Sequence, residues 1–253
     1  MKYDFKGMVS DLNKYLRLPE TPVGIKYFEK KEDCQSIERI KCPKGKYTFC
    51  QILWQSISYG WTLMYTSDLA PMKYCAQVNG LYPRDEKFFT GEIFMGGWFN
   101  EPENARAHHE QLDLMDKVYE AAAISPLEAG KIEEPDICVI HGNTAQIFML
   151  MSGYLNIHYE KLPLTFGGET ECSNSWVRAM VTGKPMIAVP SFAERKFGGA
   201  KDYELVCAMS PEQLMTAIEG LKRLHKNGLR YPITHHGQTC DASTGLPKSY
   251  FDF

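Results

Sequence analysis

A strand–turn–helix unit in the middle of the chain most limits the folds that this sequence can adopt. The segment DICVI at 136–140 is short and β-branched, a turn is expected at 141–144, and AQIFMLMSGYL at 145–155 has the composition of a buried helix. Such units are the building blocks of proteins in which helices pack against a sheet. The sequence therefore predicts an α/β or α+β fold with a mixed sheet flanked by helices.

Capping residues and periodic apolar residues predict further elements. The last helix has the clearest start, because Ser210 as the N-cap, Pro211 at the first position and Gln213 at the third form a capping box, and it stops at Asn227 and Gly228. Other helices are expected at 4–17, from 50 to about 64, at 102–123 and at 175–181, and strands at 22–28, 88–95, 185–190 and 204–209.

The chain is expected to form a single domain. It has 253 residues, enough for a sizeable core, and it shows no repeat, low-complexity tract or linker rich in Pro, Gly or Ser. We predict one globular domain over residues 1–233. Residues 234–253, which are irregular and rich in Gly, Ser and Thr, are expected to form a C-terminal tail.

Charge and hydropathy exclude several classes of partner. The formal net charge is −3 and no long basic stretch is present, so nucleic acid is not expected as a partner. No apolar run approaches the roughly 18–20 residues of a membrane helix. The first residues, MKYDFKGMVSDLNKYL, do not have the apolar core of a signal peptide, and we expect a cytoplasmic protein.

Eight cysteines are then the main feature to explain. A chain without an export signal is expected to keep them reduced, and the absence of a C-x-x-C motif argues against a zinc ribbon, a thioredoxin site or a ferredoxin-type run. Any metal site must therefore be assembled from distant parts of the chain. Cys50, Cys75 and Cys172 each lie at or near a predicted helix start, where free N–H groups favour a thiolate.

A structural interpretation of each cysteine stays open, because free cysteine is among the most buried residue types. Cys138 and Cys207 lie within predicted strands and are expected in the core. Cys34 and Cys42 flank a charged loop, and Cys42 is a possible further ligand. Cys240 lies in the tail and has no predicted role.

Other residue types near these positions suggest a small-molecule site. Gly167 and Gly168 precede the Cys172 helix and form a turn that could cradle an anionic group. His141 follows a strand end, where α/β sheets bind ligands. Arg195 precedes a glycine pair and could clamp a carboxylate, and Glu171 could move protons. Lesser candidates are Lys73 and Arg178 for an anionic substrate and Glu169 for protons. The pairs His108–His109 and His235–His236 are interpreted as an exposed helix face and a polar tail.

Four segments together carry a family resemblance. They are PVGIKYF near the start, FCQ followed by KYCAQVNGL, GGETECSNSWVRAMVTGKPMIAVPSFAERKFGG, and YELVCAMSPEQLMTAIEGL. Over roughly residues 10–230 the chain resembles the uncharacterised family called domain of unknown function 169, which is common in anaerobes and archaea. The resemblance implies that the recurring cysteines of the family match Cys50, Cys75 and Cys172, and it implies no particular reaction.

The first functional hypothesis is an iron–sulfur enzyme. Cys50, Cys75 and Cys172 would hold a [4Fe–4S] cluster with one open iron that binds a small anionic substrate for elimination, hydration or reductive removal of a substituent. The anaerobic distribution that the resemblance implies fits an oxygen-sensitive cluster. The alternatives are a non-catalytic cluster for electron transfer or sensing, a zinc site with three cysteines, a thiol-based enzyme, and a metal-free binding module. An electron-donor protein and a second copy of the chain are possible partners.

Overall fold

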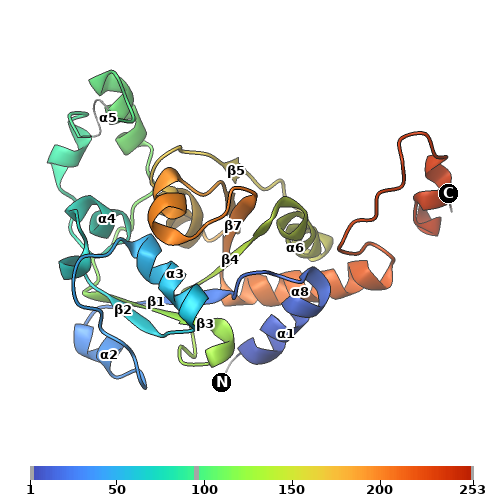
Figure 1. The fold of residues 1–253 in the computed structure, drawn as a ribbon, viewed down its shortest axis with the longest axis horizontal. Coiled ribbons are helices and arrows are strands. Elements are labelled where there is room, and N and C mark those ends of the chain that lie inside the picture. Colours follow the sequence, from blue (N-terminus) through green and yellow to red (C-terminus); the bar gives the residue numbers. More distant parts are fainter. Residues whose placement is uncertain (1–2, 94–96, 252–253) are drawn as a thin grey trace.

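A seven-stranded mixed sheet with helices on both faces forms the frame of the residues that the computed structural model describes, 3–93 and 97–251 (Figure 1). The strand order is β2-β3-β1-β4-β7-β6-β5, and the β5–β6 pair is parallel while the other pairs are antiparallel. In that order the strands are Leu63–Tyr65, Ala121–Pro126, Val23–Phe28, Ile137–Asn143, Glu204–Met209, Met186–Ala188 and Leu164–Thr165. The predicted α/β class with a mixed sheet in one domain is confirmed.

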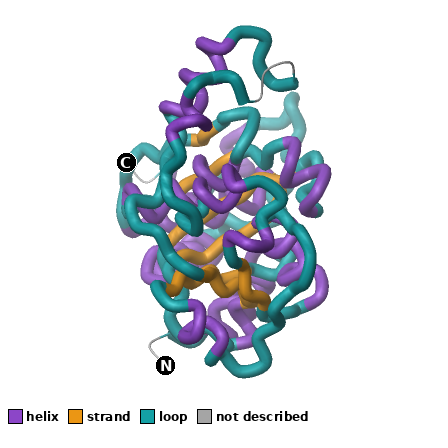
Figure 2. The backbone as a smooth tube through the Cα atoms, turned by 90° about the vertical axis from the view of Figure 1, so that its left-hand side faces the viewer, coloured by secondary structure: helices purple, strands orange, loops and turns teal. Residues whose placement is uncertain are grey.

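The central strand β4 separates two hydrophobic cores. Ile137 and Val139 point into one core and Cys138 and Ile140 into the other, because successive side chains of a strand point to opposite faces. Both faces are covered, so β4 is buried along most of its length. Strands surrounded by helices run through the middle of the molecule in Figure 2. The expected core positions of Cys138 and Cys207 are confirmed, since neither is exposed.

The described residues contain eight α-helices, and most of them pack against the sheet. The core that contains Cys138 is closed by α1, α6 and α8, and the core that contains Val139 is closed mainly by α3, α4 and a helix at 171–182. This last helix consists of an opening turn, a π-helical segment Ser173–Val177 and α7. The α-helices are α1 Phe5–Leu16, α2 Lys31–Gln35, α3 Phe49–Tyr59, α4 Lys73–Val78, α5 Pro102–Glu110, α6 Thr144–Ile157, α7 Arg178–Thr182 and α8 Pro211–Lys226.

The predicted capping box at the start of α8 is confirmed. The Ser210 side chain accepts a hydrogen bond from the Gln213 backbone N–H, and the Gln213 side chain accepts one from the Ser210 backbone N–H. The same reciprocal pattern begins α3 at Thr48 and α6 at Asn143. β4 therefore continues to Asn143, through most of the segment that was expected to be a turn.

The helix predicted at 102–123 is wrong in its second half. α5 ends at Glu110, and residues 121–126, AAAISP, form strand β3. Alanine favours helices, but β3 pairs with β1 on one side and β2 on the other and is buried throughout, so the tertiary context outweighs local propensity.

Two further expectations on the α3 side are also wrong. The helix that carries Cys50 ends at Tyr59, because Gly60 caps it with a left-handed conformation (φ 68°), and Leu63–Tyr65 then form β2. The strand expected at 88–95 is a 3₁₀ turn at Glu86–Phe89 followed by irregular chain at 90–93, and residues 94–96 lie outside the described residues. Adjacent Phe88 and Phe89 are buried in the same core, which a strand would not allow.

The C-terminal segment extends away from the sheet at the right of Figure 1. Residues 234–251 are nearly all exposed and contain two short 3₁₀ turns, Ala242–Gly245 and Lys248–Tyr250. Among the described residues, no helix has the length and apolar character that crossing a membrane requires.

The contact between α6 and α8 predicts a strong effect of one substitution. A Cβ at Gly220 would lie 1.9 Å from the backbone oxygen of Gly153, so Gly220→Ala must push the two helices apart. The overlap outweighs the gain of about 1 kcal/mol in helix propensity, and we expect the free energy of unfolding to fall by about 2 kcal/mol in urea titration. Gly97→Ala is the control, because open space surrounds Gly97. Equal urea midpoints for the two variants would contradict the prediction.

Candidate functional site

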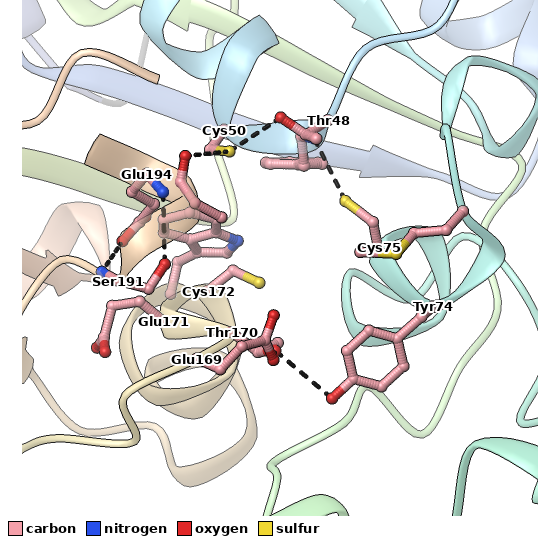
Figure 3. Close-up of a pocket in the computed structure, with 14 residues that line it drawn as sticks. Thr48, Cys50, Tyr74, Cys75, Glu169, Thr170, Glu171, Cys172, Ser191 and Glu194 are labelled. Carbon is pink, nitrogen blue, oxygen red and sulfur yellow. Dashed lines mark hydrogen bonds between the residues drawn. The ribbon is translucent and has the colours of Figure 1, made fainter. Parts of the chain in front are cut away.

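Three cysteines that are far apart in the sequence line one cavity, here called the cysteine pocket (Figure 3). Cys50 is the second residue of α3, Cys75 is the third of α4, and Cys172 lies in the first turn of the helix at 171–182. Their sulfur atoms face the same space in Figure 3. The cavity is partly open to solvent. The structure thus brings together the three cysteines that the sequence singled out.

The capping box of α3 positions Cys50. Thr48 caps the helix through its hydroxyl, which also lies 2.9 Å from the Cys50 sulfur. The same sulfur lies 3.8 Å from the carbonyl oxygen of Ala193, a pocket residue in the segment after β6. The start of α3 is therefore tied to the far side of the pocket through Cys50.

Two core residues contact the Cys75 sulfur. The backbone N–H of Phe49 donates to its sulfur at 3.4 Å, and the Tyr65 hydroxyl lies 3.8 Å from the same atom. Phe49 in turn packs against the Tyr65 ring at 5.1 Å and the Trp176 ring at 5.7 Å. The position of this sulfur is therefore fixed by buried aromatic packing.

Asn79 joins Cys75, Cys172 and Trp176. Its Nδ2 donates to the Cys75 carbonyl at 2.9 Å and to the Cys172 sulfur at 3.6 Å, and its Oδ1 accepts from Trp176 Nε1 at 2.8 Å. Asn79 has no exposed surface. A single amide thus fixes two of the three cysteines relative to each other.

All three thiols have raised pKa values, which differs from the expectation of thiolates at helix starts. Burial is the largest cause for Cys50, Cys75 and Cys172, and the other acidic groups of the pocket raise the pKa values of Cys50 and Cys172 further. The desolvation of the charged form therefore outweighs the field of the helix N-termini. Without an added positive charge these groups are thiols at neutral pH.

Three glutamates share the pocket. Burial raises the pKa of Glu171 to about 10, with a smaller contribution from nearby Glu194, and burial raises the pKa of Glu194 to about 7. The Ser191 backbone N–H donates to Glu194 at 3.1 Å. Neither carboxyl oxygen of Glu171 has a hydrogen-bond partner among the described residues. Glu171 is therefore protonated at neutral pH, and Glu194 is near its midpoint.

Glu169 is held differently. Its carboxylate accepts a hydrogen bond from the Thr170 hydroxyl and lies 3.5 Å from His108 Nε2. Thr170 has φ 60°, a left-handed conformation that is rare for a β-branched residue. Such conformations cluster at ligand sites, where surrounding structure holds them in place.

These donors match the chemistry of a soft metal centre. Thiolates are the usual ligands of iron–sulfur clusters, and N–H groups that donate to the sulfurs, as those of Phe49 and Asn79 do, tune such centres. Within the described part of the pocket lining, no lysine, arginine or histidine supplies a positive charge. A bound cation would therefore lower the pKa values of the thiols and carboxyls together.

The spacing of these groups bears on which metal they fit. Among residues 3–93 and 97–251, no group of three or more His, Cys, Asp or Glu side chains is arranged to hold a metal ion. One zinc ion would require its sulfur ligands to lie about 3.8 Å apart, given the usual Zn–S distance of about 2.3 Å. A cluster binds each cysteine through a different iron and so accepts wider spacing. The described residues therefore do not present a preformed site for a single metal ion.

His141 and Arg195 do not line the cysteine pocket. His141 is buried against the Trp54 ring at 4.9 Å. Arg195 donates to the carbonyl oxygens of Pro190 at 3.1 Å and Lys201 at 2.6 Å, so its guanidinium fixes the chain after β6. The structure therefore gives both residues a packing environment away from the three sulfurs.

The remaining residues that the sequence suggested for the site lie outside the described lining of the cysteine pocket. Gly167 belongs to a neighbouring cavity, and Gly168 makes a turn with φ 77° outside the described pocket lining. Arg178 pairs with Asp113 at 2.6 Å, and Lys73 donates to the Tyr82 hydroxyl at 2.9 Å. Exposed Cys42 and Cys240 are not among the described pocket residues, nor are the pair His235–His236.

Sequence reasoning missed Asn79, Ser191 and Thr170. Asn79 ends α4 four residues after Cys75, a spacing that places a side chain one turn from the cysteine. That spacing was a usable signal. Nothing local marks Ser191 or Thr170, because each reaches the pocket through the path of a loop.

Fold and pocket together define an α/β protein with a buried site of cysteines and carboxyls. The family model of domain of unknown function 169, described as an uncharacterised ArCR, matches residues 11–220, and the chain belongs to that family. All three cysteines lie within the matched region. Neither the curated proteins nor the solved structures gave a match to this chain.

Asn79 gives a prediction on stability. Asn79→Leu would leave Trp176 Nε1 and the Cys75 carbonyl without their partners, at about 1–3 kcal/mol for each buried group. We expect the free energy of unfolding to fall by about 3 kcal/mol in urea titration of the metal-free protein. Asn104→Leu on the exposed surface of α5 is the control and should change it little. A loss no larger than that of the control would contradict the bridging role of Asn79.

His141 predicts acid sensitivity. Burial, with a smaller contribution from Lys201, lowers its pKa from 6.5 to about 3. Since the unfolded chain binds this proton below pH 6.5 and the folded chain does not, the contribution to stability is complete above pH 6.5 and is lost as the pH falls toward 3.

We expect His141→Phe to remove about 2 kcal/mol of the loss in stability between pH 6.5 and pH 5. Urea unfolding at both pH values measures this difference. His158→Phe is the control because His158 is exposed. If wild type and His141→Phe lose the same stability over this interval, the assignment is wrong.

Proposed function

We propose that the cysteine pocket holds an iron–sulfur cluster through Cys50, Cys75 and Cys172, with one iron that no cysteine binds, and that the protein uses it to act on a small molecule. The observation that carries the proposal is the convergence of three cysteines from α3, α4 and the helix at 171–182 on one cavity. Ordinary core packing gives no reason for three thiols from distant segments to share a space with three glutamates.

The charge of the pocket supports a positively charged occupant. Three thiols and three carboxyls line it, and no basic side chain is among the described lining residues. Gathering these groups lowers stability unless they stay protonated or meet a cation. Binding of a metal allows several buried thiols to lose their protons together, because the positive charge of the metal stabilises the thiolates.

The residues beside the cysteines suggest proton chemistry. When bound, the cluster would supply an open iron that acts as a Lewis acid and holds a substrate oxygen or sulfur. Glu171 keeps a proton on its carboxyl at neutral pH in the metal-free pocket, and a lower pKa beside a bound cation would make it a stronger candidate acid. Glu194, with a pKa of about 7, can hold or release a proton on its carboxyl near neutral pH. Elimination, hydration or reductive removal of a substituent would use such a pair.

Anaerobic purification with metal and sulfide analysis tests the proposal. We expect about four irons and four acid-labile sulfides per chain, with broad visible absorption from thiolate-to-iron charge transfer. A colourless zinc protein would replace the cluster with a three-cysteine zinc site. A protein free of metal after anaerobic reconstitution with iron and sulfide would overturn the proposal and favour a metal-free binding module.

Single substitutions identify the ligands. Cys50→Ser, Cys75→Ser and Cys172→Ser should each lower the iron content at least severalfold, because a hydroxyl replaces a thiolate ligand. Exposed Cys42→Ser and buried Cys138→Ser are the controls and should keep the iron. Circular dichroism confirms folding of each variant. Loss of iron in Cys138→Ser with retention in Cys172→Ser would reverse the assignment.

Mild oxidation separates an open-iron cluster from a carrier. An iron without a cysteine ligand dissociates first, so the iron content should fall from about four to about three per chain. Electron paramagnetic resonance should then report a three-iron cluster. A cluster that keeps all its iron under the same treatment would favour electron transfer or sensing instead.

A further inference from the structure

A second cavity borders the same helix that carries Cys172. Asn174 and Arg178 line it, whereas Cys172 and Trp176 line the cysteine pocket. Residues four apart lie on one side of a helix, so these two pairs mark two different faces. His108 from α5 and Phe166 from the chain after β5 also line this second cavity, here called the donor cavity.

Two buried N–H donors of the residues that line the donor cavity have no acceptor. Asn174 Nδ2 and Arg178 Nε are each shielded from solvent and have no hydrogen-bond partner among the described residues, whereas His108 Nε2 lies 3.5 Å from the Glu169 carboxylate. An unsatisfied buried donor costs about 1–3 kcal/mol, so most buried donors in folded proteins are paired. Two unsatisfied donors on neighbouring turns of one helix beside one cavity indicate a ligand that brings acceptor atoms.

The surroundings of Arg178 limit the charge of that ligand. Its Nη1 donates to Asp113 at 2.6 Å, which balances much of the guanidinium charge and leaves Nε unused. His108 lies 3.5 Å from Glu169. No aspartate or glutamate is among the described lining residues of the cavity itself. This balance suits a singly charged anion better than a dianion.

Apolar side chains lie beside these donors. Phe166 is 77% exposed, and Leu112 lines the same cavity. Gly167 passes so close to Asn174 that a Cβ there would lie 2.3 Å from Nδ2. The missing side chain of Gly167 therefore leaves room for the amide.

We propose that the donor cavity binds a small monocarboxylate that carries an apolar group. One carboxylate oxygen accepts from Asn174 Nδ2, the other accepts from Arg178 Nε, and the apolar group packs against Leu112 and Phe166. His108 Nε2 lies next to this carboxylate. The site is distinct from the cysteine pocket and does not depend on the function proposed for it.

Titration calorimetry with benzoate and propionate tests the proposal on the full chain. We expect wild type to bind benzoate more tightly than inorganic phosphate. Asn174→Asp replaces a donor by a charged acceptor and should weaken benzoate binding at least tenfold. Asn156→Asp adds the same charge at an exposed position of α6 and should keep wild-type affinity.

Arg178→Lys is a second variant. It keeps the positive charge beside Asp113 but lacks Nε, and it should weaken benzoate binding severalfold. Circular dichroism and urea midpoints show whether each variant folds. No benzoate binding by folded wild type, or equal affinity in wild type and both donor variants, overturns the proposal. Phosphate binding that exceeds benzoate binding overturns the carboxylate assignment.

The same titration with Cys172→Ser keeps this inference separate from the cluster. Benzoate affinity should not change when the iron content falls, because the donors lie on another face of the helix. Benzoate binding that disappears together with the iron would overturn the assignment of a distinct site.

Discussion

The desolvation of acidic groups is the interaction on which the cysteine pocket depends. Six acidic side chains, three thiols and three carboxyls, line a cavity without a basic neighbour among the described lining residues. Each stays neutral by keeping a proton or becomes charged only beside a cation, because low polarity penalises isolated charges. The unusual pKa values of Glu171 and Glu194 and the raised thiol pKa values follow from the same cause.

The sheet and its cores make this arrangement rigid. Strands β1 and β4 support the core that contains Phe49 and Trp176, and these two side chains adjoin all three cysteine-bearing helices. Asn79 then links Cys75 to Cys172 through hydrogen bonds to the Cys75 carbonyl and the Cys172 sulfur rather than through chain connectivity. A site built this way keeps its geometry before any ligand binds, which lowers the cost of ordering it.

The sequence predicted the class of fold and the cysteines of the site, because those signals are local. Capping at Ser210, the amphipathic helix at the N-terminus and the β-branched run before His141 each involve neighbours within a few residues. The wrong predictions concern segments whose structure depends on distant residues. The alanines of β3 form a strand because β3 pairs with β1 and β2, and Phe88 and Phe89 are not in a strand because both side chains are buried in the same core. Arg195 was predicted to bind a carboxylate because of its charge, but its guanidinium donates to the backbone carbonyl groups of Pro190 and Lys201, which the path of the loop brings close to it.

The distance between the cysteines along the chain has a consequence for biosynthesis. Cys50 and Cys75 emerge from the ribosome about 120 and 100 residues before Cys172. At about 5–20 residues per second, this leaves the first two thiols without their third partner for roughly 5–24 s. Their own helices, α3 and α4, also lack the helix that packs over them during that time. If the protein holds a cluster as proposed, its three cysteines can bind that cluster together only after the helix at 171–182 has been made and has packed against α3 and α4.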